Sequence, residues 1–204
     1  MPRPTKPIIS RQNASAAALD TIEQDGLANF GLGRVAQRLG VRAPSLYHHF
    51  ESKDELLSEV SRLLLIEGTL PKIKEGLDWR EEIVRISTAS WRSVLRHPHA
   101  APLLLQFFPR TLLMGAYEHW MHVLDVCGVP ARWHITILEG SEKFTYGSAL
   151  FAASARARGV PPYGEINAER YPYIFAAVEA HPFDEEETFV QALRAFLNGM
   201  PIES

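Results

Sequence analysis

The stretch Gly33–Leu57 constrains the fold of this chain more than any other part of the sequence. Four apolar residues fall at the i, i+3, i+4 and i+7 spacing of a helix face, and Gly40 follows them directly. Glycine often ends a helix at this point, because it adopts the left-handed cap conformation at little cost. Pro44 suits the first turn of a second, short helix, in which Leu46 and Phe50 lie one turn apart and face inward. The stretch therefore predicts a helix-turn-helix, whose second helix enters the major groove of DNA.

The side of this second helix that faces away from the core carries groups suited to DNA. Side chains at its N-terminal end reach base edges, and Arg42 has the two-pronged donor that reads guanine well. Neighbouring serine, histidine, alanine and proline side chains supply single hydrogen bonds or touch a thymine methyl group. Tyr47, Lys53 and Arg34 are expected to bind phosphates, although Tyr47 has the alternative of a core position. The predicted DNA contacts are Arg34, Arg42, Ala43, Pro44, Ser45, Tyr47, His48 and Lys53.

The run LGVRAPSLYHHFESKDELL resembles the DNA-binding signature of the tetracycline-repressor (TetR) family. The resemblance extends from Arg11 to about Leu64. Its specific parts are the SLYxHF tail, the lysine three residues later and the paired leucines that begin a long helix. It implies that Tyr47 and Lys53 contact the DNA backbone. The positions that approach bases in the family correspond to Arg42, Ala43 and Ser45.

The resemblance also implies an all-α fold, in which a three-helix head is joined to a larger helical domain. In the family, the larger domain dimerises and usually holds a small-molecule pocket, and a bound ligand tilts the fourth helix and spreads the two heads. We therefore divide the chain into an arm at 1–9, a helix-turn-helix head at 10–52 and an effector-binding and dimerisation domain at 53–204. The arm is interpreted as a disordered tail, with a basic arm that follows phosphates or the minor groove as the alternative.

Charge is distributed unevenly along the chain. The net charge is −3, yet residues 1–53 hold seven basic and four acidic residues, which leaves the remainder at −6. A basic end on an acidic body suits a protein that binds DNA at one end.

The single cysteine, Cys127, excludes an internal disulfide and fits a reducing compartment. No apolar run reaches the ~20 residues of a membrane span and no apolar signal core is present, so we expect a cytoplasmic protein without a membrane partner.

The main rival class, an enzyme, finds no support in the motifs of the chain. The sequence has no G-x-S-x-G, no H-E-x-x-H, no paired cysteine motif and no phosphate-binding loop, and no cofactor is predicted. His119 and His122 lie three residues apart on one helix, which is a spacing that metal ligands use. Without a third ligand nearby, this pair does not predict a metal site.

Helical periodicity continues through the body, and no segment shows the alternation of a strand. Ser10 or Asn13 is expected to cap the first helix, and Asp78 with Glu81 to begin a later helix in the manner of a capping box. The fourth helix, from about Lys53, is expected to tie the head to the body, because three short helices bury too little apolar surface alone. The helices expected after it cover 78–96, 98–107, 109–127, 131–158, 168–180 and 184–199.

Two of these helices, 131–158 and 184–199, are predicted to pair with their copies in a homodimer. The first has small and large residues alternating along one face, which suits close contact between helices. The second has an apolar seam. Burial inside one subunit is the alternative for both helices. The face comprises Gly140, Phe144, Gly147, Phe151 and Ala155, and the seam comprises Phe189, Leu193, Phe196 and Met200.

The helices between are expected to form the walls of a pocket for a small-molecule effector. A pocket needs an apolar cleft with a few convergent polar groups, and each candidate has plain core or surface placement as its alternative. The candidates are Trp91, Phe107, Phe108, Arg110, Tyr117, His119, Trp120, His134, Glu139 and Phe144.

The sequence thus predicts a ligand-responsive transcriptional regulator, by family default a repressor. It would bind a palindromic operator in double-stranded DNA as a dimer and be released by a small molecule. The alternative is a ligand-independent architectural or division-linked DNA-binding protein of the same fold. A deep, partly apolar cavity in the body would favour the sensor, and a filled body would favour the architectural role.

Overall fold

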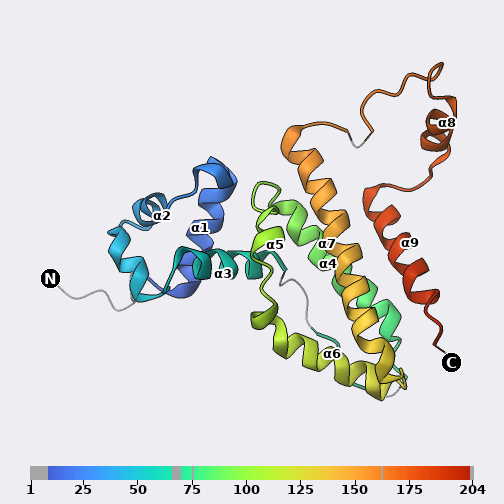
Figure 1. Ribbon diagram of the computed structural model, residues 1–204, viewed down its shortest axis with the longest axis horizontal. Coiled ribbons are helices and arrows are strands. Elements are labelled where there is room, and N and C mark those ends of the chain that lie inside the picture. The colour runs from blue at the N-terminus through green and yellow to red at the C-terminus, as the bar shows by residue number, and fades with distance from the viewer. Residues whose placement is uncertain (1–8, 66–69, 75, 162, 203–204) are drawn as a thin grey trace.

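The computed structural model describes residues 9–65, 70–74, 76–161 and 163–202, and these contain helices and turns but no strand. The all-α prediction is confirmed. Figure 1 shows a small head that contains α1 and α2 at one end, joined through α3 to a larger helical body. The α-helices are α1 Arg11–Asp25, α2 Leu32–Arg38, α3 Lys53–Leu65, α4 Trp79–Arg96, α5 Leu103–Gln106, α6 Met114–Val126, α7 His134–Arg158, α8 Pro172–Ala180 and α9 Glu185–Asn198, and the 3-10 helices are η1 Leu27–Asn29, η2 Ala43–His48, η3 Arg110–Leu113 and η4 Ala131–Trp133.

Helix α1 begins in a capping box that uses both of the predicted capping residues. The backbone N–H of Asn13 donates to Ser10 Oγ at 3.2 Å, and the N–H of Ser10 donates to Asn13 Oδ1 at 2.6 Å. The helix ends at Gly26, whose φ of +78° lies in the region that favours glycine. Most of the predicted arm, residues 1–8, lies outside the described part of the chain, while Ile9 is buried.

The helix-turn-helix has the predicted order but a tighter second helix. Val35 of α2 and Leu46 and Phe50 around η2 are almost completely buried, and Gly40 turns the chain between the helices with a φ of +66°. The second helix, Ala43–His48, is a 3-10 helix rather than the α-helix that the spacing suggested. Its Pro44 lies in the first turn, where the missing N–H leaves no bond unmade.

Helix α3 belongs to the cores of both parts of the molecule. It packs against α1 of the head and against α4 and α5 of the body. Its apolar stripe is buried along its length, so the head and the body share one continuous core. The expected link between head and body is therefore present. The buried stripe consists of Leu56, Leu57, Val60, Leu64 and Leu65.

The body is built around α4 and α7, which pack closely against each other, with α9 against both. Asp78 caps α4 by accepting from the backbone N–H groups of Arg80 and Glu81 at 3.1 and 3.2 Å. The side chain of Glu81 does not complete a capping box, because it binds Arg194 of α9 at 2.7–2.9 Å. Helix α8 contributes no residue to the core and lies apart from the other helices in Figure 1.

Several predicted boundaries shift where proline or a 3-10 turn intervenes. The segment expected to be helical over 98–107 contains only α5, and α8 starts four residues later than predicted because Pro172 occupies its first turn. The helix expected over 109–127 divides into η3 and α6, and that expected over 131–158 begins with η4 before α7. None of the described helices is long and apolar enough to cross a membrane.

The apolar seam of α9 packs inside its own subunit, which corrects its proposed role in a dimer. Phe189, Leu193 and Met200 are buried, and the ring of Phe189 stacks on Trp91 of α4 with the ring centroids 5.6 Å apart. A Cβ at Gly140 of α7 would overlap with the ring of Phe196, so this glycine allows α9 to approach closely. The alternative given for the seam is therefore the observed one.

We predict that Leu193→Ala destabilises the protein by about 2–5 kcal/mol, because the substitution leaves a cavity where α9 meets α4 and α7. Urea denaturation followed by circular dichroism would measure the change. Gln191→Ala, an exposed position on the same helix, is the matched control and should stay within about 0.5 kcal/mol of the parent protein. Equal effects of the two substitutions would contradict the packing described here.

Candidate functional site: the η2 surface and the body cavity

The outward side of η2 presents most of the predicted DNA contacts to solvent. Arg42, Pro44 and His48 are exposed, and Ala43 and Ser45 are half-buried beside them. Tyr47 is 57% exposed, which excludes the alternative of a core position. The arrangement follows from Leu46 and Phe50, which take the inward side and leave the intervening side chains outside.

Arg11 fixes the end of η2 against the two neighbouring helices. Its Nη1 donates to the carbonyl oxygen of His49 at 2.6 Å and lies 2.7 Å from Glu55 of α3, while its guanidinium covers the ring of Phe50 at 4.6 Å. The hydrogen bond with Glu55 raises the pKa of Arg11 above its ordinary value. The pKa of Glu55 is lowered by a hydrogen bond from the backbone N–H of Glu51 and by Arg11. We call this set of contacts of Arg11 with His49, Glu55 and Phe50 the Arg11 clamp. The sequence analysis did not predict it, because the partners lie 38 or more residues after Arg11 in the chain.

The predicted phosphate-binding cations lie at the surface but already have partners. Arg34 forms an ion pair with Asp25 at 2.9 Å. Lys53 is exposed, and its Nζ lies 3.5 Å from the carbonyl oxygen of Phe30 and 5.2 Å from the centroid of the Phe30 ring. Since both side chains retain solvent access, both can turn to an anion beside the head.

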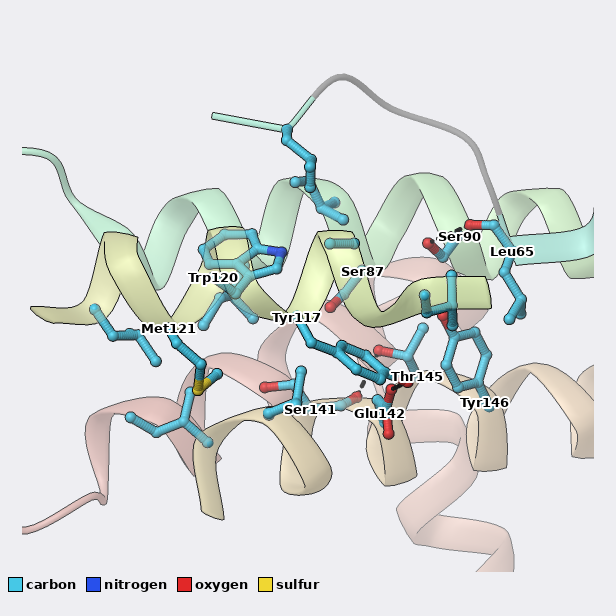
Figure 2. Close-up of a pocket in the computed structure, with 18 of the residues that line it drawn as sticks. Leu65, Ser87, Ser90, Tyr117, Trp120, Met121, Ser141, Glu142, Thr145 and Tyr146 are labelled. Carbon is cyan, nitrogen blue, oxygen red and sulfur yellow. Dashed lines mark hydrogen bonds between the residues drawn. The ribbon is translucent and has the colours of Figure 1, made fainter. Parts of the chain in front are cut away.

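The second feature is a cavity of about 400 Å³ in the body, bounded by α4, α6 and α7. Its volume lies within the range of sites for small molecules. The end of α3, the chain at Leu70 and the end of η3 also contribute to the wall, so the cavity touches the helix that carries the head. Figure 2 shows side chains from these helices converging on this space. Most of the lining is aliphatic, and the aromatic and polar side chains in it are Ser87, Ser90, Tyr117, Trp120, Ser141, Glu142, Thr145 and Tyr146.

A carboxylate and a phenol meet in the cavity wall. The hydroxyl of Tyr117 on α6 donates to Glu142 Oε1 on α7 at 2.6 Å, as the dashed line in Figure 2 shows. Arg110 of η3 lies 3.3 Å from the other oxygen of Glu142. Burial and the bond to Glu142 raise the pKa of Tyr117, so the phenol remains a donor. Burial likewise raises the pKa of Tyr146.

Hydroxyl groups in the wall are used unequally. Ser90 Oγ of α4 donates to the carbonyl oxygen of Leu65 at 3.2 Å and so holds the C-terminal end of α3. Thr145 Oγ1 donates to the carbonyl oxygen of Ser141 at 2.7 Å. The hydroxyl of Ser141 is buried and has no hydrogen-bond partner among the described residues.

Of the ten residues predicted to line a pocket, Tyr117 and Trp120 do so, and the other eight lie outside the lining. Trp91 packs on Phe189 and donates from Nε1 to Ser148 at 3.0 Å. His134 is buried with Nε2 2.8 Å from the Val129 carbonyl oxygen. These side chains are occupied by contacts within the core, which is the alternative given for each.

Most of the remaining candidates contact other residues outside the cavity lining. Arg110 reaches Glu142 from outside the lining, and Phe108 meets Tyr146 edge-on with the centroids 5.2 Å apart. Phe107 is half-buried against the core. Glu139 pairs with Lys143 at 2.7 Å, and Phe144 lies beside Phe196 with the centroids 5.2 Å apart.

Helix periodicity explains which polar residues the sequence reasoning missed. Ser141, Glu142 and Thr145 fall within about one turn of α7, on the side that lines the cavity. Glu139 and Phe144 fall on other sides of the same helix. Polar residues on one face of a helix that points inward could have indicated these cavity residues. To identify that face, one must know which side of α7 packs against α4 and α6.

The two histidines with metal-ligand spacing do not form part of a cluster. His119 Nε2 lies 2.8 Å from the carbonyl oxygen of Pro71, and His122 is exposed. Within the described residues, no group of three or more histidine, cysteine, aspartate or glutamate side chains is placed to hold a metal ion.

Comparison with known proteins matches both parts of the chain. The family model for bacterial regulatory proteins of the tetR family matches residues 15–60, and that for the tetracyclin repressor-like C-terminal domain matches residues 70–203. An HTH-type transcriptional regulator from Saccharopolyspora erythraea is 32% identical over 99 residues, which are 48% of this chain and 42% of that protein. The class A tetracycline repressor from Escherichia coli is 26% identical over 191 residues, which are 90% of this chain and 87% of that protein.

Solved structures share the whole architecture. The crystal structure of TetR-Q116A from Acinetobacter baumannii AYE in complex with minocycline superposes with a TM-score of 0.68 at 21% sequence identity, over 93% of this chain and 94% of that chain. At this identity the likeness establishes the fold, while the two family models cover the head and the body. Proteins of this family are transcriptional regulators and not enzymes. With its helix-turn-helix head and its helical body both matched, the chain belongs to the TetR family of DNA-binding bacterial transcriptional regulators.

Proposed function

We propose that the protein is a ligand-responsive repressor, which binds a palindromic operator as a homodimer and leaves it when a small molecule fills the body cavity. The observation that carries this proposal is the position of α3. Leu65, near its C-terminal end, lines the cavity, and the same helix packs against α1 of the head. A molecule in the cavity therefore touches the element that orients η2.

The proposed release is a linkage between two binding sites. An effector shifts the equilibrium only if it binds more tightly to the arrangement of heads that does not fit DNA. DNA must then weaken effector binding by the same factor. The bond from Ser90 to the Leu65 carbonyl oxygen offers a route for this coupling, because it joins α3 to a residue that also lines the cavity.

On the DNA side, we assign base contacts to the N-terminal part of η2 and phosphate contacts around it. The exposed guanidinium of Arg42 supplies the bidentate donor for guanine. Tyr47, Lys53 and Arg34 supply phosphate contacts, and Arg34 would share its charge with Asp25. One head offers few contacts, so specific binding requires two heads on half-sites about one helical turn apart. The remaining proposed base contacts are Ala43, Pro44, Ser45 and His48.

The proposed dimer forms through the outward faces of α7 and α9. Phe144 is exposed, and Phe151, two turns further along α7, is 84% exposed. Gly147 lies between them, and a Cβ there would have nothing within 4 Å among the described residues. A glycine inside a helix costs about 1 kcal/mol relative to alanine, and no neighbour in the described part of its own subunit requires one at this position. Close approach of a second α7 would supply that reason.

The alternative, a ligand-independent architectural protein, is less well supported by the body. An unfilled apolar space lowers stability, because its walls lack packing partners. A cavity of about 400 Å³ with a carboxylate and several hydroxyls in its wall is an arrangement suited to ligand binding. This is the feature that distinguishes the two hypotheses.

The direct test of the proposed function is DNA release. Fragments of the source genome would be selected on the immobilised protein, and the genes next to the bound site would suggest effectors. We expect fluorescence anisotropy to show a labelled site bound by the dimer and released by one such compound. Binding that no cavity-occupying compound changes would favour the architectural alternative.

We predict that Tyr47→Ala weakens operator binding at least about tenfold, since a hydrogen bond to a charged group contributes about 1.5–3 kcal/mol and each head loses one. Anisotropy titration would measure the affinity, and light scattering would verify that the dimer is intact. Tyr173→Ala, which removes an exposed tyrosine from α8, is the control and should bind DNA normally. Unchanged affinity in the first variant would remove Tyr47 from the DNA surface.

We predict that Lys53→Ala flattens the salt dependence of DNA binding. Each phosphate contact contributes about 0.9 to the slope of log K against log salt concentration, so loss of one contact per head lowers the dimer's slope by about 2. Titrations over a range of salt concentrations would give the slope. Lys74→Ala, at an exposed position in the segment before α4, removes the same charge away from the head and from the proposed dimer face and should leave the slope unaltered.

A further inference from the structure

We propose that the body cavity takes a lipophilic organic cation, a molecule with an aromatic or aliphatic body and a positive charge that pairs with Glu142. The identification of this molecule as the effector rests on the proposed function, whereas its chemical class rests on the cavity alone.

The charges in the cavity wall are of one sign. Glu142 is the one acidic residue in the described lining, and that lining contains no lysine, arginine or histidine. The side chain of Glu142 is only 13% exposed. A carboxylate removed from water requires a positive partner or several donors, so the wall favours a cation in the space beside it.

The protein itself provides only a weak positive partner for Glu142. Arg110 makes a single contact with Glu142 at 3.3 Å, its side chain is 56% exposed, and it does not line the cavity. Its guanidinium also lies 5.4 Å from the centroid of the Phe108 ring. Water weakens an ion pair with so exposed a partner. A cation inside the cavity would approach the carboxylate where water is scarcer and the attraction is stronger.

The remaining lining matches the rest of such a molecule. Tyr117, Trp120 and Tyr146 contribute aromatic rings, which attract cations over their faces and pack against apolar bodies. The Tyr117 hydroxyl is committed to Glu142 and orients the carboxylate. Ser141, adjacent to Glu142 in the chain, has a buried hydroxyl without a partner among the described residues, and it can accept from an N–H of an ammonium ligand.

An anion of the same size would bind poorly for the same reasons. It would meet the carboxylate of Glu142 and the negative faces of the aromatic rings, and the described part of the lining has no cation to compensate. Neutral molecules would gain from apolar burial alone. The charge of the ligand, rather than its shape, is therefore the property that the cavity selects.

Tetraphenylphosphonium and tetraphenylborate test this inference, because they have nearly the same size and shape and opposite charges. Isothermal titration calorimetry on the full-length protein is expected to show the phosphonium binding at least about tenfold more tightly than the borate. Glu142→Gln should weaken phosphonium binding at least about tenfold. Glu118→Gln, an exposed acid beside Tyr117 on α6, is the matched control and should bind as the parent protein does.

Arg110→Ala gives a second, opposite readout. If Glu142 is a ligand-binding carboxylate, removal of its competing partner should strengthen phosphonium binding. If the Arg110–Glu142 pair serves only to stabilise the fold, the same substitution should weaken phosphonium binding. Circular dichroism of each variant would verify folding, and this variant keeps the test decisive should Glu142→Gln fail to fold.

Borate binding as tight as phosphonium binding would overturn the inference, as would unchanged phosphonium binding by a folded Glu142→Gln variant. The outcome is separable from the proposed function. Phosphonium binding that depends on Glu142 but leaves DNA occupancy unchanged would support the inference and contradict the proposed release. Release of DNA by a neutral or anionic compound, with no phosphonium binding, would overturn the inference and leave the proposed function standing.

Discussion

The structure depends on one buried stripe of leucine and valine along α3. A thirteen-residue helix is about 20 Å long, and nearly all of its apolar side chains are withdrawn from water by two different sets of neighbours. A three-helix head alone buries too little apolar surface for secure stability, so the head relies on this shared helix. The consequence is mechanical. A helix packed tightly at both ends transmits displacement as a rigid body, because close-packed cores deform little.

The clamp around Arg11 complements this stripe on the polar side. One guanidinium joins α1, the end of η2 and α3 through the His49 carbonyl oxygen, Glu55 and the Phe50 ring. Apolar packing alone permits small rotations, whereas hydrogen bonds with fixed directions do not. The orientation of η2 is thus tied to α3 by side chains that never need to touch DNA.

Sequence reasoning succeeded where the determinants are local and failed where they are not. The head could be predicted because Gly40, Pro44 and the Leu46–Phe50 spacing specify turn and helix within a few residues. The 3-10 form of η2 escaped prediction, since α and 3-10 helices share these signals over six residues. In the body, all helices longer than eight residues were anticipated, but not which faces meet. Consequently Trp91 and His134 were proposed for the cavity and lie in the core, while Ser141 and Glu142 were overlooked.

The short length of η2 limits the number of base pairs that one subunit can read. A 3-10 helix rises about 2 Å per residue, so six residues form a rod about 12 Å long, comparable to the width of the major groove. A helix that only crosses the groove contacts a few base pairs. A DNA sequence of that length occurs many times in a chromosome. Bacterial DNA offers on the order of 10⁶ competing sites. In the proposed dimer, the spacing between two such helices supplies the specificity that one helix lacks. A change in that spacing would abolish recognition of the operator without altering any residue that contacts a base.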